Sequence, residues 1–227
     1  MEHAEAMLRR APLFEALDDE ATRELQAGAV EVQLARSERL FDEGDDGDRL
    51  YVVLDGKIKL TRASVDGREN LISVIGPGEM FGELSLFDPR PRTMSASAIT
   101  DVRLAGVAHD YLRTWLTGRP DVAMHLLAAL ARRLRRTNEV MSDLVFTDVP
   151  GRVAKALLDL AARFGTQRED GLQVNHDLTQ EELAQLVGAS RETVNKALAD
   201  FVARGWIQLH PKSVLLIDPE RMRRRAR

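Results

Sequence analysis

The chain has 227 residues, 44% hydrophobic and 30% charged, so it is long enough for two modest domains or one large one, with a proper core. It contains no cysteine, which excludes disulfides, thiolate zinc sites and cysteine-ligated iron–sulfur clusters. No apolar run approaches the roughly 20 residues that a membrane span needs, and the acidic N-terminus is unlike a secretory signal. We therefore expect a cytoplasmic protein with no membrane partner.

The net charge of −4 is divided unevenly along the chain. Residues 151–227 hold 13 Lys and Arg against 10 Asp and Glu, whereas the first 150 residues hold 19 against 26. This asymmetry predicts that a polyanionic partner binds the C-terminal part. The arginine-rich end 221–227 is expected to be solvated and to add at most electrostatic affinity.

Residues 8–28 carry a helical pattern that begins near Pro12. Its apolar anchors are Leu13, Phe14, Leu17 and Leu25. From about residue 30 to residue 108, short β-rich runs are separated by glycine turns, with Asp66-Gly67 as a hairpin signal. Many short strands at close spacing predict an antiparallel barrel or jelly roll.

Residues 78–85, followed by Pro91-Arg92-Thr93, contain the residue types that a small anionic nucleotide requires. Gly82 lets the backbone pass close to a ligand, and Glu83 is an acceptor suited to a ribose 2′-hydroxyl. Arg92 offers a fork that matches two phosphate oxygens, and Thr93 adds a hydroxyl donor. A surface Glu–Arg pair is the plain alternative, but the surrounding strands favour a ligand site.

A weakly helical segment at 109–117 and Pro120 precede a long predicted helix from about 121 to 145. Its apolar residues follow a heptad pattern with one gap, at Thr137. The members are Ala123, Leu127, Leu130, Leu134, Met141 and Leu144. Such a stripe could pack on the barrel, but a repeat over three heptads more often joins two helices, so we predict a homodimer.

Residues 146–152 separate the long helix from the next and are predicted to form a hinge. Pro150 is tolerated in a first helical turn, and Asp148 can cap the helix that follows. The remaining expected elements are a helix at 150–164, a polar loop at 165–171, a short strand containing His176-Asp177, and a β-wing from the runs 206–209 and 214–217.

The segment 179–198 predicts a helix-turn-helix. Thr179 and Glu182 form a capping box, Ser190 offers a second N-cap, and Gly188 ends the first helix. The apolar face consists of Leu183, Val187, Val194 and Leu198, and the outward face of Arg191, Glu192, Asn195 and Lys196. An ordinary helical hairpin is the alternative, but long polar side chains at the start of the second helix favour DNA recognition.

The order of β-roll, long helix, hinge and winged helix-turn-helix resembles the cyclic-AMP receptor protein family of bacterial regulators (the CRP/FNR superfamily). Residues 132–138, 146–152 and 178–198 look most similar to its actinobacterial global-regulator branch. The resemblance implies an α+β fold with a cyclic-nucleotide-binding jelly roll at 1–120, a dimerisation helix and hinge at 121–147, and a DNA-binding domain at 148–227.

The resemblance also implies that the effector is 3′,5′-cyclic AMP. Its phosphate-binding cassette would begin with Gly82, Glu83, Leu84 and Ser85, and Arg92 and Thr93 would hold the cyclic phosphate. Thr137 would reach the adenine, which would explain the gap in the heptad pattern, and Asn138 would reach it from the partner subunit. Enteric relatives have a serine at the position of Asn138, so phosphate binding follows more directly than base discrimination.

For DNA, the resemblance implies that Arg191, Glu192 and Lys196 contact bases, and that Thr179 and Ser190 contact phosphates. Arginine suits guanine, a carboxylate accepts from cytosine, and lysine reaches a second guanine with less directional bonding. The implied partners are double-stranded DNA with TGTGA-like palindromic half-sites, a second copy of the chain, and RNA polymerase. Asp148 is the implied hinge residue, and no metal is expected.

Two alternatives remain open at this stage. One is a regulator of the same fold that binds DNA without a ligand or responds to another nucleotide. The other is a nucleotide-binding module that regulates an enzyme, although residues 151–227 contain no nucleophile–base set and no metal cluster. The five histidines also show no haem-ligand pattern. We therefore expect a regulator that is not itself an enzyme.

Overall fold

The computed structural model describes residues 19–64, 67 and 69–226 of the chain. The chain divides into two compact units, Met1–Arg135 and Arg136–Arg227, and each is described by itself. Of the predicted N-terminal helix, the described part forms α2 (Asp19–Ala27). Leu13, Phe14 and Leu17, and the hairpin residue Asp66, lie outside the described residues.

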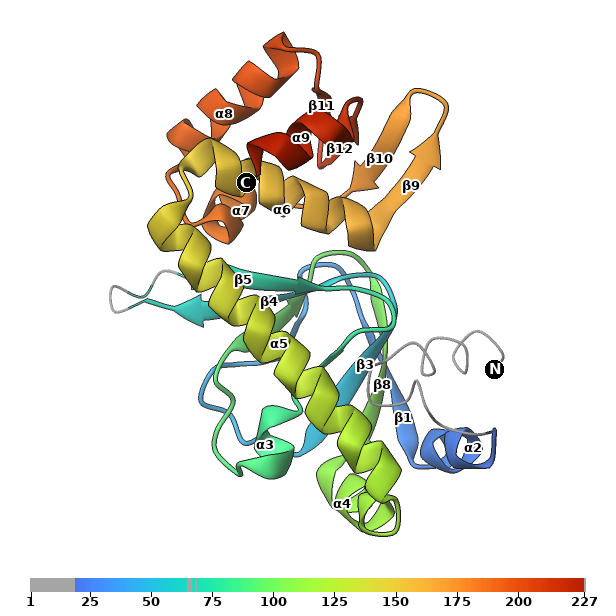
Figure 1. The fold of residues 1–227 in the computed structure, drawn as a ribbon. Coiled ribbons are helices and arrows are strands. Elements are labelled where there is room, and N and C mark those ends of the chain that lie inside the picture. The colour runs from blue at the N-terminus through green and yellow to red at the C-terminus, as the bar shows by residue number, and fades with distance from the viewer. Residues whose placement is uncertain (1–18, 65–66, 68, 227) are drawn as a thin grey trace. The chain divides into compact units, whose positions relative to one another are not determined.

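The first unit is built around two four-stranded antiparallel sheets (Figure 1). One sheet has the strand order β1-β8-β3-β6 and the other β2-β7-β4-β5. The strands are β1 Ala29–Leu34, β2 Arg39–Phe41, β3 Arg49–Asp55, β4 Ile58–Ala63, β5 Glu69–Ile75, β6 Met80–Phe81, β7 Ser95–Ala98 and β8 Val102–Ala108. The predicted β-rich runs are therefore strands, and the β4–β5 pair confirms the expected hairpin.

Strand β3 is buried on both faces and joins the two halves of the core. Leu50, Val52 and Leu54 point into one cluster, and Tyr51 and Val53 point into another, as the two-residue period of a strand requires. The first cluster also receives side chains from α2 and from the helices α3 (Leu84–Phe87), α4 (His109–Thr117) and α5 (Pro120–Phe146).

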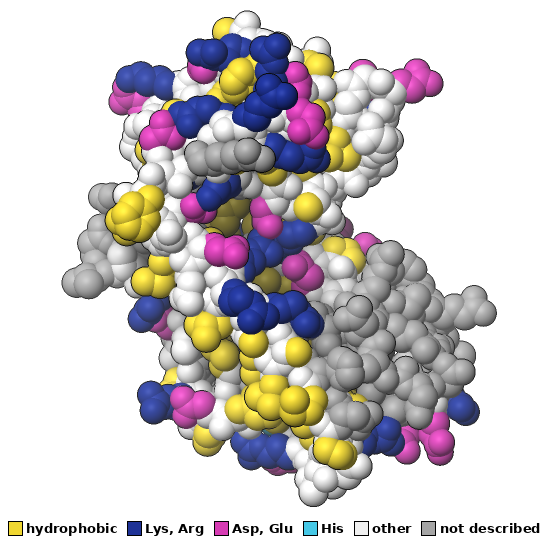
Figure 2. Space-filling view, viewed as in Figure 1, with side chains coloured by type: hydrophobic (Ala, Val, Ile, Leu, Met, Phe, Trp, Pro, Cys, Tyr) yellow, Lys and Arg dark blue, Asp and Glu magenta, His cyan; other side chains and the backbone are white. Residues whose placement is uncertain are grey.

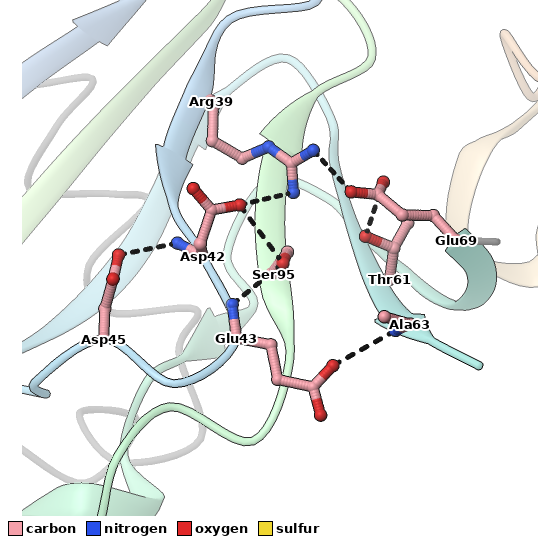
Figure 3. Close-up of polar contacts among 8 residues, drawn as sticks. All are labelled: Arg39, Asp42, Glu43, Asp45, Thr61, Ala63, Glu69 and Ser95. Carbon is pink, nitrogen blue, oxygen red and sulfur yellow. Dashed lines mark hydrogen bonds and ion pairs between the residues drawn. The ribbon is translucent and has the colours of Figure 1, made fainter. Parts of the chain in front are cut away.

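A polar network holds the β2-β7-β4-β5 sheet to the loop that follows β2 (Figure 3). The guanidinium of Arg39 pairs with Asp42 at 3.0 Å and with Glu69 at 2.6 Å. Ser95 Oγ accepts the amide of Glu43, whose carboxylate in turn accepts the amide of Ala63. The loop that begins at residue 42 is therefore fixed to three strands of the sheet.

Helix α5 exposes a stripe of large apolar side chains, which Figure 2 shows along its lower course. The most regular members recur every seven residues, at Leu127, Leu134 and Met141, and each is at least half exposed. Met124, Val140, Leu144, Val145 and Phe146 add to the exposed apolar surface. Within one chain these side chains are exposed to solvent over much of the helix, so most of the stripe is not covered by the β-roll.

The second unit combines helices with a four-stranded antiparallel sheet in the order β11-β12-β10-β9. Its elements are α6 Val149–Phe164, β9 Gly165–Arg168, β10 Gly171–Asn175, α7 Gln180–Val187, α8 Arg191–Ala203, β11 Ile207–His210, β12 Ser213–Leu216 and α9 Pro219–Arg225. The predicted core residues Leu183, Val187, Val194 and Leu198 are all buried. The two runs predicted as a wing form the β11–β12 hairpin.

Residues 165–171 differ from the expectation of a polar loop, because they pair as β9 with β10 in a hairpin. The side chains of β9 are all exposed, so this edge strand lacks the apolar alternation that identifies a strand in sequence. The strand predicted to contain His176 and Asp177 also differs, because the observed strand lies earlier in the chain. Strand β10 ends at Asn175, and Asp177 has a positive φ of 61° in a turn where His176 Nδ1 accepts the amide of Leu178.

Candidate functional site

The first unit contains a cavity of about 330 Å³ beside α3. It is bounded by β4, β6, α3, the segment that connects α3 to β7, and the first half of α5. Its lining includes Gly82, Glu83, Leu84, Ser85, Arg92 and Thr93, together with Phe41, Leu130 and Arg133. The structure therefore brings together all six residues predicted for the phosphate end of the ligand.

Arg92 is buried at the base of this cavity, with only 6% of its surface exposed. Its Nη1 donates to the carbonyl of Gly82 at 3.0 Å and to Ser85 Oγ at 3.4 Å, and Nη2 donates to the carbonyl of Arg49 at 2.8 Å. Its Nε is buried without a hydrogen-bond partner among the described residues. These bonds orient the guanidinium, and no carboxylate among the described residues forms an ion pair with it, an arrangement suited to binding an anion.

The surroundings of Arg92 fix its position closely. The guanidinium lies over the ring of Phe41, 4.4 Å from its centre. Gly82 has a φ of +81°, and a Cβ there would lie 2.7 Å from Arg92 Nη1, so glycine is required for both conformation and space. Burial lowers the pKa of Arg92 below its usual value, whereas nearby Tyr51 and acidic residues oppose the shift.

Glu83 is still more buried, at 1% exposed, and its two carboxylate oxygens differ in their contacts. Oε1 accepts a hydrogen bond from Arg133 of α5, while Oε2 has no partner among the described residues. A buried carboxylate oxygen without a donor costs free energy, so such an atom calls for an explanation. A hydroxyl of a bound ligand would satisfy it.

The other predicted ligand residues differ in exposure. Ser85 is buried beside Arg92, whereas Leu84 and Thr93 are exposed at the cavity. Thr137 and Asn138 lie on α5 within the second unit and have exposed side chains. The predicted contacts of this pair with an adenine base remain predictions.

In the second unit, the local signals of the helix-turn-helix are present as the sequence predicts. The Thr179 side chain accepts from the amide of Glu182, whose carboxylate accepts from the amide of Thr179, so the capping box is complete. Gly188 ends α7 in a left-handed conformation with φ of 69°. Ser190 caps α8 by accepting the amide of Thr193. Caps at both helices fix where each begins.

The three predicted base-reading residues are exposed on the first turns of α8. Arg191 and Glu192 are the first two residues of the helix, and Lys196 lies one turn later. Lys196 Nζ pairs with Glu192 at 2.7 Å, so these two side chains are held on one face of the helix. Asn195, expected to face outward, is half-buried.

The predicted hinge residue Asp148 caps α6 and makes a second contact. One carboxylate oxygen accepts the amide of Gly151 at 3.0 Å, and the other pairs with Arg225 of α9 at 2.5 Å. This hydrogen bond with Arg225 is the main reason that the pKa of Asp148 lies below its ordinary value. The start of α6 is therefore fastened to the C-terminal helix.

Comparison with known proteins identifies both parts of the chain. Residues 31–118 match the cyclic nucleotide-binding domain family, and residues 151–225 match the Crp-like helix-turn-helix domain family. A Mycobacterium tuberculosis protein named "CRP-like cAMP-activated global transcriptional regulator" is 58% identical over 97% of this chain and 99% of that protein. The chain belongs to the CRP family of transcription regulators.

Two solved structures of transcription regulators are similar to this fold. The N-terminal domain of a transcriptional regulator from Streptomyces coelicolor A3(2) is 59% identical and covers 59% of this chain and 95% of that structure, with a TM-score of 0.51. A c-di-GMP-responsive global regulator of Xanthomonas campestris is 26% identical and covers 88% and 99%, with a TM-score of 0.74. The predicted family and the predicted α+β fold are confirmed.

Two arginines that the sequence does not single out contact residues of the predicted sites. Arg133 contacts Glu83, and its position one helical turn before Thr137 on α5 was the signal available. Arg152 donates to the carbonyls of Thr147, Val187 and Gly188, which ties the hinge to the turn of the helix-turn-helix. No local pattern in the sequence predicts these three acceptors.

Within residues 19–64, 67 and 69–226, neither α5 nor any other helix combines the length and the apolarity that a membrane crossing demands. In the same residues, no group of three or more His, Cys, Asp or Glu side chains is arranged to hold a metal ion.

Proposed function

We propose that this CRP-family regulator is a homodimer that binds 3′,5′-cyclic AMP in the β-roll and responds by binding palindromic DNA. The observation that carries the proposal is the pair of buried ionic groups in one cavity: Arg92 without a carboxylate partner, and Glu83 with a free oxygen, among the described residues. The cavity volume of about 330 Å³ lies within the usual range for small-ligand sites. The cAMP-activated relative named above supports the choice of nucleotide.

In this proposal the cyclic phosphate binds at Arg92, Thr93 and the cassette formed by Gly82, Leu84 and Ser85. Arg92 supplies the charge, and the hydroxyls of Ser85 and Thr93 supply donors. Glu83 Oε2 accepts the ribose 2′-hydroxyl, which removes an unpaired buried acceptor. Thr137 and, from the partner subunit, Asn138 bind the adenine.

The exposed stripe on α5 supports the proposed dimer. Leu127, Leu134 and Met141 recur every seven residues and are open to solvent in the single chain. Pairing α5 with its copy would bury this surface in a heptad seam. The dimer would also place two recognition helices on one DNA molecule.

The proposed DNA interface consists of α8 and the caps around it. Arg191, Glu192 and Lys196 read bases in the major groove of TGTGA-like half-sites, and Thr179 and Ser190 bind phosphates. Nucleotide that contacts both copies of α5 favours one arrangement of the dimer, and the Asp148 hinge reorients the recognition helices. The protein acts in the cytoplasm with RNA polymerase as a further partner, and we assign it no catalytic role.

Isothermal titration of the full-length protein with cyclic AMP tests the nucleotide site. Wild type should bind one nucleotide per subunit, and Arg92→Ala should weaken binding by about 2–5 kcal/mol because a buried charged partner is lost. Arg103→Ala is the matched control, since Arg103 is an exposed arginine of β8 that pairs with Glu31 away from the cavity. Unchanged affinity in Arg92→Ala would contradict the assignment.

A second candidate is a regulator of the same fold that responds to another nucleotide or to none. The similarity to a regulator described as c-di-GMP-responsive favours keeping this candidate. Gel shifts with a palindromic TGTGA-like site, performed without ligand and with cyclic AMP, cyclic GMP or c-di-GMP, distinguish the cases. Tight DNA binding without any nucleotide would favour the ligand-independent form.

A further inference from the structure

His109 is a buried histidine next to the cavity that the proposed binding of nucleotide does not use. It is the first residue of α4, directly after β8, and only 4% of its surface is exposed. It is absent from the cavity lining, so any effect on a ligand must pass through its neighbours. Those neighbours are the two backbone turns that enclose Arg92.

Two hydrogen bonds join His109 to these turns. Its backbone amide donates to the carbonyl of Asp48 at 2.8 Å, and its Nε2 lies 3.2 Å from the carbonyl of Gly82. Because a carbonyl only accepts, Nε2 carries the proton in this bond. His109 therefore links the loop after β2 to the turn that begins the cassette.

Gly82, and Gly47 next to Asp48, both lie beside Arg92. A Cβ on Gly47 would lie 3.3 Å from the Arg92 guanidinium carbon, and a Cβ on Gly82 would lie 2.7 Å from its Nη1. The carbonyl of Gly82 also accepts from Arg92 Nη1, so His109 and Arg92 share this acceptor. Without the imidazole, the Gly82 carbonyl would lose one of its two hydrogen bonds and would hold Arg92 Nη1 less firmly in place.

The backbone of Arg92 is held by the same loop. The amide of Arg92 donates to the carbonyl of Asp45 at 2.7 Å, and its carbonyl accepts from Gly44 at 2.9 Å. The network of Figure 3 anchors this loop to the sheet, and His109 anchors its far end through Asp48. The loop that holds the backbone of Arg92 is therefore fixed at both ends, and this restricts where the guanidinium can lie.

We propose that His109 is a positioning residue for nucleotide binding, which orients the Arg92 fork toward the phosphate through the carbonyl of Gly82. This inference rests on the proposed nucleotide site. Alignment of a bidentate fork with two phosphate oxygens depends on geometry as well as charge. A small loss of alignment should therefore weaken phosphate binding even though the charge of Arg92 remains.

Titration calorimetry of full-length variants with cyclic AMP tests the inference. His109→Leu keeps a similar apolar volume but removes the donor, and should weaken binding about tenfold, the effect of one buried hydrogen bond. His109→Gln keeps a donor at the distal position and should remain within about twofold of wild type, whereas the shorter amide of His109→Asn should not restore binding. His210→Leu, on the exposed β11, is the matched control for a histidine-to-leucine change.

A double-mutant cycle with Arg92→Lys separates positioning from a general structural effect. Lysine has no fork to align, so in the R92K background His109→Leu should cost less than about twofold. An equal tenfold loss in both backgrounds, or failure of His109→Gln to bind better than His109→Asn, would overturn the inference. If His109→Leu does not fold, the comparison of Gln with Asn still decides. Absence of cyclic AMP binding by wild type would instead contradict the proposed function.

Discussion

At the scale of single residues, the candidate nucleotide site differs from an ordinary surface Glu–Arg pair. Arg92 and Glu83 are not bonded to each other; each has its own partners and each keeps one buried polar atom unpaired among the described residues. Buried polar atoms normally have hydrogen-bond partners. The free-energy cost of leaving one unpaired is tolerated at a site where a bound ligand supplies the missing partner.

Glu83→Gln should weaken cyclic AMP binding about tenfold, because a hydrogen bond to a charged acceptor becomes a bond to a neutral one. The same substitution should change the affinity for 2′-deoxy-cyclic AMP much less, since that ligand lacks the hydroxyl that Glu83 accepts. Calorimetric titration of both nucleotides measures the difference. Equal losses for the two ligands would show that Glu83 does not bind the 2′-hydroxyl.

His109 should also make stability depend on pH. Burial is the main cause that holds the pKa of His109 below its ordinary value, and Arg92 and Arg113 nearby add to it, although the hydrogen bond with the Gly82 carbonyl opposes the shift. The unfolded chain therefore takes up this proton more readily than the folded chain does, so the free energy of unfolding is highest above about pH 6.5. It falls as the pH drops below that value and through the folded-state pKa of His109. The unfolding midpoint of wild type should fall more between about pH 7.5 and about pH 5.5 than that of His109→Gln. Parallel decreases would contradict this.

At the scale of elements, two helices lead to testable predictions: α5, through its exposed apolar stripe, and α9, through its packing in the second unit. Helix α5 carries apolar side chains that the β-roll does not cover, and these form the exposed heptad stripe. Helix α9 differs from the expected solvated tail. Met222 is fully buried, and Arg225 pairs with Asp148, the predicted hinge residue, so this segment is a structural part of the second unit.

Leu134→Glu should convert the proposed dimer to monomers, because a charge without a partner would be buried in the seam. Arg132→Glu introduces the same charge two residues earlier on the same helix, outside the heptad positions, and should leave the dimer intact. Sedimentation velocity measures both. A stable dimer in Leu134→Glu would place the interface elsewhere.

Ending the chain after Asp218 should destabilise the second unit by about 1.5–3 kcal/mol, the contribution of burying one large apolar side chain such as Met222. Arg224→Ala, on the exposed side of the same helix, is the control and should be nearly neutral. Denaturant unfolding of the full-length and shortened chains measures the change. An unchanged free energy of unfolding would restore the solvated-tail interpretation.

At the scale of the whole molecule, the proposed function requires two copies of α8 to reach successive major grooves. In a dimer that binds a palindrome, the recognition helices should lie about 34 Å apart, one turn of DNA. The exposed positions of Arg191, Glu192 and Lys196 at the start of α8 suit this geometry.

Arg191→Ala should cost about 1–3 kcal/mol of DNA affinity and relax the preference mainly at one guanine per half-site. Arg223→Ala changes an arginine that pairs with Glu220 on α9, and should leave sequence preference unchanged. Selection of binding sites from a random DNA pool compares the two variants. Wild-type preference in Arg191→Ala would assign base reading to other residues.

The sequence by itself determined the parts that depend on local bonding. The capping box of Thr179 and Glu182, the left-handed Gly188 and the cap at Asp148 involve residues within a few positions of each other, so their spacing encodes the structure. The strand runs of the β-roll and the heptad stripe of α5 follow from periodicity in the same way.

Only the tertiary structure decided which distant groups meet. The Arg92 fork is held by carbonyls of Arg49 and Gly82, and Asp148 is paired with Arg225 from the far end of the chain. The edge strand β9 exists because β10 offers it backbone partners, although its own side chains are all exposed. Such contacts depend on packing and on backbone groups that every residue carries, so no residue type or spacing along the chain identifies them.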